Sequence, residues 1–229
     1  MKRFDNDVAS LQSRLSEMGD LAKSMVVLAT AAIKDRTRDV HGELYECEKT
    51  INKMQTDIDQ DAIRMLTIYG PVAKDLRFLL VCTHVTAKLE RIGDLAVNIC
   101  QALELMTTDP ADRPLRAGVR KMADTTCEIV DDALDAYFSK NQEKAIVTRR
   151  RDDIVDAMND QVMKEFLTNE VLREVLSGAA DIGEAVAQIL ISRYLERIAD
   201  QATNICKEVV YMVKGDDVRH VRNNAAADG

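Results

Sequence analysis

The sequence predicts an all-α protein in which two tandem antiparallel three-helix bundles follow one another along the chain. Apolar residues recur at three- and four-residue spacing over long stretches, which is the pattern of amphipathic helices. The 229 residues include only three prolines and nine glycines, so few positions interrupt a helix. Residues 89–100 (LERIGDLAVNIC) and 195–206 (LERIADQATNIC) are identical at nine of twelve positions, which indicates an internal duplication.

The first half of the chain contains three predicted helices, which cover residues 5–38, 42–69 and 73–106. Leu11, Leu15 and Met18 show the helical spacing in the first of them. Gly70 and Pro71 end the second, because proline cannot continue a helix. Residues 107–114 (TTDPADRP) hold two of the three prolines and divide the chain almost in half.

The second half repeats this order, with predicted helices at residues 115–139, 142–168 and 181–213. Helices of about thirty residues are about 45 Å long, and three of them joined by short loops pack best as an antiparallel bundle. We therefore expect one repeat at residues 1–108 and a second at 115–214. The remaining residues, 215–229, end in NNAAADG and are predicted to be disordered.

Composition excludes several classes of function. A net charge of −8 argues against nucleic-acid binding. No apolar run reaches the length of a membrane span, and the N-terminus lacks the apolar core of a signal peptide. The five cysteines form no CxxC pair, which favours a reduced, cytoplasmic protein. The phosphate-loop, dinucleotide, nucleophile-elbow and zincin motifs are all missing, so we expect no enzyme.

The duplicated segment places acidic residues on helices that are otherwise strongly apolar. Glu90 and Asp94 lie four residues apart, and Glu196 and Asp200 repeat the spacing at an offset of 106. Four residues on a helix drift by only about 40°, so each pair forms one polar stripe. Carboxylates in such surroundings are costly unless cations, hydrogen bonds or a metal partner them.

A second polar pair occurs in each half. Glu48 and Asn52 lie four residues apart in the second predicted helix, and Asp152 and Asp156 do so in the fifth. Carboxylates that converge from two facing helices can bind a hard or borderline cation. Each bundle is therefore a candidate metal site.

Other interpretations stay open at this point. Most acidic pairs at this spacing are solvated helix faces, and Arg91 and Arg197 offer structural salt bridges to the carboxylates. A purely structural, metal-free scaffold would use them in this way. A metal-storage or redox protein is a further alternative. However, no histidine follows a glutamate by three residues, so the ligands of ferritin-like di-iron bundles are absent.

The doubled LERIGD…NI and LERIAD…NI segments resemble the signature of the PhoU family of phosphate-uptake regulators. Residues 70–77 (GPVAKDLR) and 211–220 (YMVKGDDVRH) are similar to family segments that flank the third and sixth helices. The resemblance covers nearly the whole chain. It implies two similar three-helix bundles and E/DxxxD motifs that hold iron or zinc clusters. Carried over by position, the metal ligands are Glu90, Asp94, Glu196, Asp200, Asp152, Asp156 and Glu48, with a neutral Asn52 in the eighth place.

The resemblance also implies a role. Such proteins are negative regulators of the phosphate-starvation response and restrain high-affinity phosphate uptake. They act as adaptors between the ATPase subunit of the phosphate ABC transporter and the phosphate-sensing histidine kinase. A homodimer, and a cytoplasmic location at the inner face of the membrane through those partners, without insertion, are further expectations.

Overall fold

The structure is a computed structural model that describes residues 2–106, 115–166 and 182–215. Over these residues it contains α-helices and no strand, which confirms the predicted fold class. The helices are α1 (Lys2–Lys34), α2 (His41–Tyr69), α3 (Ala73–Leu103), α4 (Ala117–Phe138), α5 (Gln142–Arg149), α6 (Asp152–Phe166) and α8 (Ile182–Lys214).

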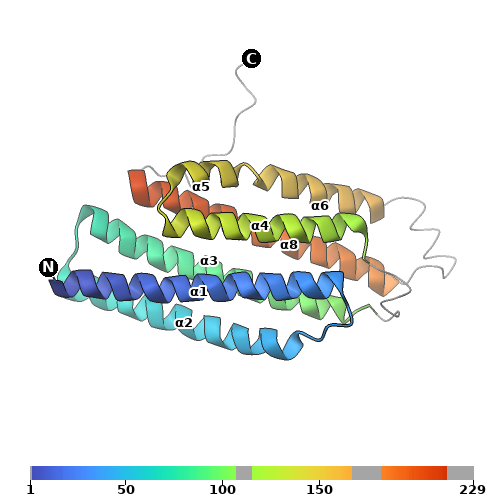
Figure 1. Cartoon of the computed structure of the whole chain (residues 1–229), viewed down its shortest axis with the longest axis horizontal. Helices are drawn as coiled ribbons and strands as arrows, with labels where there is room; N and C mark the ends of the chain where they lie inside the picture. The colour runs from blue at the N-terminus through green and yellow to red at the C-terminus, as the bar shows by residue number, and fades with distance from the viewer. Residues whose placement is uncertain (1, 107–114, 167–181, 216–229) are drawn as a thin grey trace, which may run out of the picture.

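The helices form two elongated bundles that lie side by side with their long axes roughly aligned (Figure 1). Helices α1, α2 and α3 pack on one another, and α4, α5, α6 and α8 form the second group. The most extensive contact between any two described helices joins α3 to α8, the two that carry the duplicated segment. Helix α1 also packs on α4, so the two bundles share one continuous core.

Helix α2 ends where the sequence predicts. Gly70 adopts a left-handed conformation with φ of 52° and ψ of 48°, and its N–H donates to the carbonyl of Leu66 at 3.2 Å. Glycine is favoured at this position because it lacks a Cβ, and Pro71 then cannot donate a further helical hydrogen bond. This turn reverses the chain, so that α3 runs antiparallel to α2 and carries its acidic stripe back along α2.

The predicted fifth helix is two helices in the structure. Helix α5 ends at Arg149. After it, the N–H of Arg150 donates to the carbonyl of Val147, and the N–H of Arg151 donates to the carbonyl of Thr148. Cations are favoured at the C-terminus of α5, and Asp152 is favoured at the start of α6, by the helix dipoles. The predicted end of this helix, at 168, lies outside the described residues.

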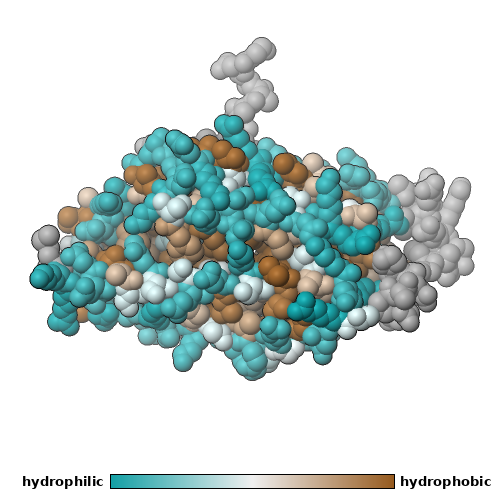
Figure 2. All heavy atoms as spheres, in the orientation of Figure 1, coloured by the Kyte–Doolittle hydropathy of each residue, from teal (hydrophilic) through white to brown (hydrophobic). Residues whose placement is uncertain are grey.

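The core is aliphatic. Val81, Val85, Leu89 and Ile92 of α3 are fully buried, because α3 packs against α1, α2 and α8. The face of the molecule seen in Figure 2 is mainly hydrophilic, with small separate apolar areas. Within the residues that the structure describes, no helix is both long and apolar enough to span a membrane. The predicted linker at 107–114 and nearly all of the predicted tail, from residue 216 onward, lie outside those residues.

Candidate functional site

The first acidic seam lies between α2 and α3. We use this name for Glu48 and Asn52 of α2 with Glu90 and Asp94 of α3. Burial and the charge of Asp94 raise the pKa of Glu90, and the charge of Glu48 adds to that rise, so the structure brings these three carboxylates together. Asn52 is exposed and contributes no charge.

The first seam carries its own counter-ion. Nη1 of Arg91 lies 3.6 Å from Oδ2 of Asp94, and the charge of Arg91 also lowers the pKa of Glu90. The structural salt bridge that the sequence left open is therefore present here. With three carboxylates and one nearby guanidinium, the repulsion in this seam is partly compensated without a metal.

The second acidic seam lies between α6 and α8 and consists of Asp152, Asp156, Glu196 and Asp200. Burial is the largest cause that raises the pKa of each of the four carboxyl groups. The pKa of Asp152 reaches about 6, with Asp200 and Asp156 as the next causes. The charges of Asp156 and Asp152 raise the pKa of Glu196, and those of Glu196 and Asp156 raise that of Asp200. The four carboxyl groups are therefore electrostatic neighbours across the junction of α6 and α8.

Neighbouring cations compensate the second seam only from a distance. Lys207 lowers the pKa values of Asp152 and Asp200, but its ammonium group donates to Oδ1 of Asn204, at 2.8 Å. Within residues 2–106, 115–166 and 182–215, no lysine or arginine forms an ion pair within 4.0 Å of any of the four acids. Arg197, the salt-bridge partner that the sequence offers here, lowers the pKa values of Glu196 and Asp200 without an ion pair within 4.0 Å among the described residues.

One carboxylate oxygen of the second seam lacks a partner. Oδ1 of Asp152 is buried without a hydrogen bond in the described structure, and so is Oδ1 of Asn159, two turns further along α6. Buried oxygen acceptors without donors are unfavourable, and a bound cation is one way to satisfy them. The donor set, four carboxylates with an amide oxygen close by, suits a hard or borderline cation.

The side chains do not form a closed coordination shell as they stand. Among the described residues, no three histidine, cysteine, aspartate or glutamate side chains lie close enough together to hold a metal ion. Binding there requires the carboxylates to approach one another, which their mutual repulsion opposes until a cation arrives. The donor types of the second seam suit a metal ion, and its four acids would hold one only after they move closer together.

The acidic stripe on α3 is only partly buried. Leu80, on the same helix, is 37 % exposed. Glu90 and Asp94 are half-buried, with one side of the stripe facing solvent. The seams thus lie on the bundle surface at the junction of two helices, where an ion can enter.

A polar cluster that the sequence did not predict lies between the bundles. Glu208 of α8 is 2 % exposed and contacts Lys88 and His84 of α3. Ala102 occupies the corresponding place in the first repeat, so the duplication gives no signal for Glu208. A signal exists within α8, because Glu208 continues the four-residue spacing of Glu196. Three such steps rotate it by about 120° from Glu196, onto the face that packs against α3.

The fold and the seams together define a class: duplicated helical-bundle proteins with an acid-lined junction in each half. A family profile for the PhoU domain matches the chain twice, over residues 15–103 and 119–209. The chain therefore belongs to the PhoU family, as the sequence motifs indicated. Both matched segments include one copy of the duplicated helix.

Relatives resemble the chain over nearly its full length. The phosphate-specific transport system accessory protein PhoU of Escherichia coli is 29 % identical over 96 % of this chain and 88 % of its own. A homologue from Pseudomonas putida is 30 % identical over 96 % of this chain and 84 % of its own. These names describe accessory proteins, and neither names a catalytic activity.

Solved structures confirm the architecture. PhoU from Pseudomonas aeruginosa superposes with a TM-score of 0.84 at 28 % identity, covering 93 % of this chain and 100 % of that one. The phosphate transport system regulatory protein PhoU from Streptococcus pneumoniae gives a TM-score of 0.83 at 23 % identity. This superposition covers 94 % of this chain and 99 % of that one. The second likeness is one of fold alone.

Proposed function

We propose that this protein is a non-catalytic regulatory adaptor that restrains high-affinity phosphate uptake and the phosphate-starvation response. The observation that carries the proposal is the PhoU domain in both halves of the chain, together with full-length likeness to proteins named as phosphate transport accessory proteins. In this role the protein contacts the ATPase subunit of the phosphate ABC transporter and the phosphate-sensing histidine kinase from the cytoplasmic side.

The arrangement of the bundles supports an adaptor. Two similar helical units present two long faces, and the extensive packing of α3 on α8 couples them. A partner that binds one bundle is therefore coupled to the second bundle through this packing. In a homodimer, the second copy of the chain would double the number of helical faces available to partners.

Metal is a tuning element in this proposal. An iron or zinc ion in the second seam screens the repulsion among Asp152, Asp156, Glu196 and Asp200 and satisfies Oδ1 of Asp152. The first seam binds metal less tightly, because Asn52 replaces a carboxylate and Arg91 already neutralises Asp94. The two halves then differ in metal content although they share one fold.

The experiment that tests the adaptor is affinity capture of the full chain from its own host, grown with ample and with limiting phosphate. We expect the transporter ATPase or the sensor kinase among the captured proteins, with recovery that changes with phosphate. Recovery of neither partner, with stoichiometric redox-active metal on the chain, would favour a storage or redox protein. Neither partner and no metal would favour a structural scaffold.

Elemental analysis of the same purified chain tests the metal. We expect bound iron or zinc that falls at least severalfold in the double variant Asp152→Asn with Asp200→Asn. The matched control, Asp153→Asn with Asp160→Asn, removes two exposed carboxylates beside the seam and keeps the four seam acids. Equal metal loss in both double variants would contradict a specific site.

A further inference from the structure

A cavity of about 130 Å³ lies between the two bundles, away from both acidic seams. Its walls come from both halves of the molecule: α1 and α3 on one side, and α4, α8 and the turn after α4 on the other. The residues on which the argument depends are Gln12, Phe78, Tyr137, Phe138, Lys140 and Met212.

Lys140 holds an unusual backbone conformation at this cavity. It follows α4 with φ of 53°, in the left-handed region. Its N–H donates to the carbonyl of Tyr137 at 3.1 Å, and the N–H of Asn141 donates to the carbonyl of Ala136 at 2.9 Å. Such a helix end normally carries glycine, because a Cβ is strained there. A lysine at this position keeps strain in the fold and places a cation at the cavity.

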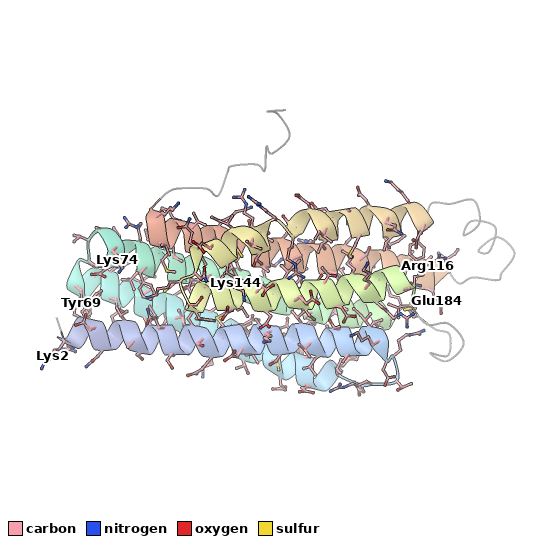
Figure 3. All side chains as sticks on the ribbon, turned by 45° about the horizontal axis from the view of Figure 1, so that its top comes forward. Lys2, Tyr69, Lys74, Arg116, Lys144 and Glu184 are labelled. Atoms are coloured by element: carbon pink, nitrogen blue, oxygen red, sulfur yellow. The ribbon has the colours of Figure 1, made fainter. Side chains whose placement is uncertain are left out.

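The charge of Lys140 is not used in an ion pair. Lys144, labelled in Figure 3, reaches Asp132 and Asp135 of α4 at 3.0 and 2.8 Å, whereas no carboxylate of the described residues pairs with Lys140. Burial raises the pKa of the Cys82 thiol to about 12, and Tyr137 and Lys140 both oppose this rise. The positive charge of Lys140 therefore acts on the buried groups behind the cavity wall.

The other walls are mostly apolar, with two neutral polar groups. Phe78, Phe138 and Met212 supply the apolar surface, and Gln12 supplies an amide. Tyr137 is only 4 % exposed, and its hydroxyl lies 3.7 Å from Sγ of Cys82, a weak hydrogen-bonding partner. The cavity therefore offers a cation and an amide beside aromatic rings.

We propose that this cavity binds one small amphipathic monocarboxylate, with the carboxylate at Lys140 and an aromatic or branched apolar body between Phe78, Phe138 and Met212. The size is appropriate, since a buried cavity of about 150 Å³ accommodates benzene. Inorganic phosphate is a poorer match, because a strongly hydrated anion gains little from apolar walls and one ammonium group. The proposal does not depend on the partners named above.

Binding at this place has a structural consequence. Because the walls come from α1 and α3 as well as α4 and α8, a ligand there favours the arrangement in which the two bundles are packed as described. The site is then an effector site, through which a small organic acid adjusts the rigidity of the pair of bundles.

Calorimetric titration of the full chain with benzoate tests the proposal, with benzyl alcohol as the neutral analogue of the same shape. We expect one saturable benzoate site per chain and binding of benzyl alcohol that is weaker by about fivefold or more. Lys140→Gln should weaken the binding of benzoate by a similar factor and leave the affinity for benzyl alcohol unchanged. The matched control, Lys121→Gln, removes an exposed lysine elsewhere on α4 and should change neither.

A second variant, Gln12→Phe, places a bulky ring at a cavity-lining position and should abolish binding of both compounds while the chain keeps its helical circular-dichroism spectrum. The proposal is overturned if benzoate, phenylacetate and isovalerate all fail to bind the intact chain saturably. It is also overturned if Lys140→Gln binds benzoate as tightly as the intact chain does, or if inorganic phosphate displaces benzoate from the site.

Discussion

The ammonium nitrogen of Lys88 on α3 lies 3.3 Å from Oε1 of Glu208 on α8, and this pair joins the two halves of the molecule. Nδ1 of His84 lies 3.3 Å from Oε2 of the same carboxylate. Both oxygens of a 2 % exposed glutamate are therefore partnered by the opposite bundle. A buried carboxylate is tolerated only with such partners, so the pair specifies how α3 and α8 are aligned.

Replacing Lys88 tests this alignment. We expect Lys88→Met to lower the free energy of unfolding by about 2–3 kcal/mol, because it leaves the charge of Glu208 buried with only His84 beside it. The double variant Lys88→Met with Glu208→Leu should regain most of the loss, since it removes the uncompensated charge. Urea denaturation measures both, with Lys121→Met as the exposed control. Equal stability of Lys88→Met and Lys121→Met would show that the pair is not structurally important.

The left-handed conformation of Lys140 leads to a gain in stability on mutation. Lys140→Gly should raise the free energy of unfolding by about 1 kcal/mol, because glycine adopts the φ of 53° without a Cβ clash. Lys140→Ala keeps the Cβ and should show no comparable gain. Chemical denaturation of the three proteins gives the comparison. A loss of stability in Lys140→Gly would mean that the lysine side chain stabilises the turn more than its backbone strains it.

Asp152 makes the metal-free protein less stable as the pH rises. Its pKa is raised from 3.8 to about 6 in the folded state, mainly by burial. Its contribution to stability is therefore full below pH 3.8 and is lost as the pH rises through 6. Asp152→Asn should raise the free energy of unfolding at pH 7.5 by about 1–2 kcal/mol, a value reduced for solvent screening of a partly exposed group.

The measurement is urea denaturation of chelator-treated protein between pH 4 and 7.5. The gain in Asp152→Asn should disappear toward pH 4, where the wild-type carboxyl group is also neutral. Asp153→Asn, one residue away and exposed, should follow the wild-type profile. If the gain in unfolding free energy is the same at every pH, the buried charge of Asp152 is not the cause of that gain.

Asn52 sets the difference between the two seams. Asn52→Asp restores a fourth carboxylate to the first seam, and we expect it to increase the metal bound per chain at saturating zinc. Thr56→Asp places the same charge one turn further along the exposed face of α2 and is the control. Elemental analysis after removal of free metal gives the stoichiometry. If the two variants bind equal amounts of metal, the position of the charge is unimportant and the first seam is not a site.

The duplication allowed much of this to be predicted from the sequence. It identified α3 and α8 as equivalent and indicated which of their acids occupy matching helix positions, because those acids recur at an offset of 106. The break after Arg149 was not predicted, although residues 148–153 (TRRRDD) interrupt the apolar spacing there. That break coincides with a long-range contact, in which Arg151 bonds to Glu128 and Asp132 of α4.

Features specific to one half were harder to predict. Glu208 has no counterpart in the first repeat, and its partners are more than a hundred residues away in sequence. The left-handed conformation of Lys140 could not be predicted either, because most helix ends of this type have glycine at this position.

The proposed role is tested most directly by phosphate uptake in host cells that lack this protein, measured in phosphate-rich medium together with a phosphate-starvation reporter. We expect phosphate uptake and reporter expression to rise well above wild-type levels and to return to them when the intact chain is restored. Unchanged uptake and an unchanged reporter in the deleted cells would contradict its role as a negative regulator.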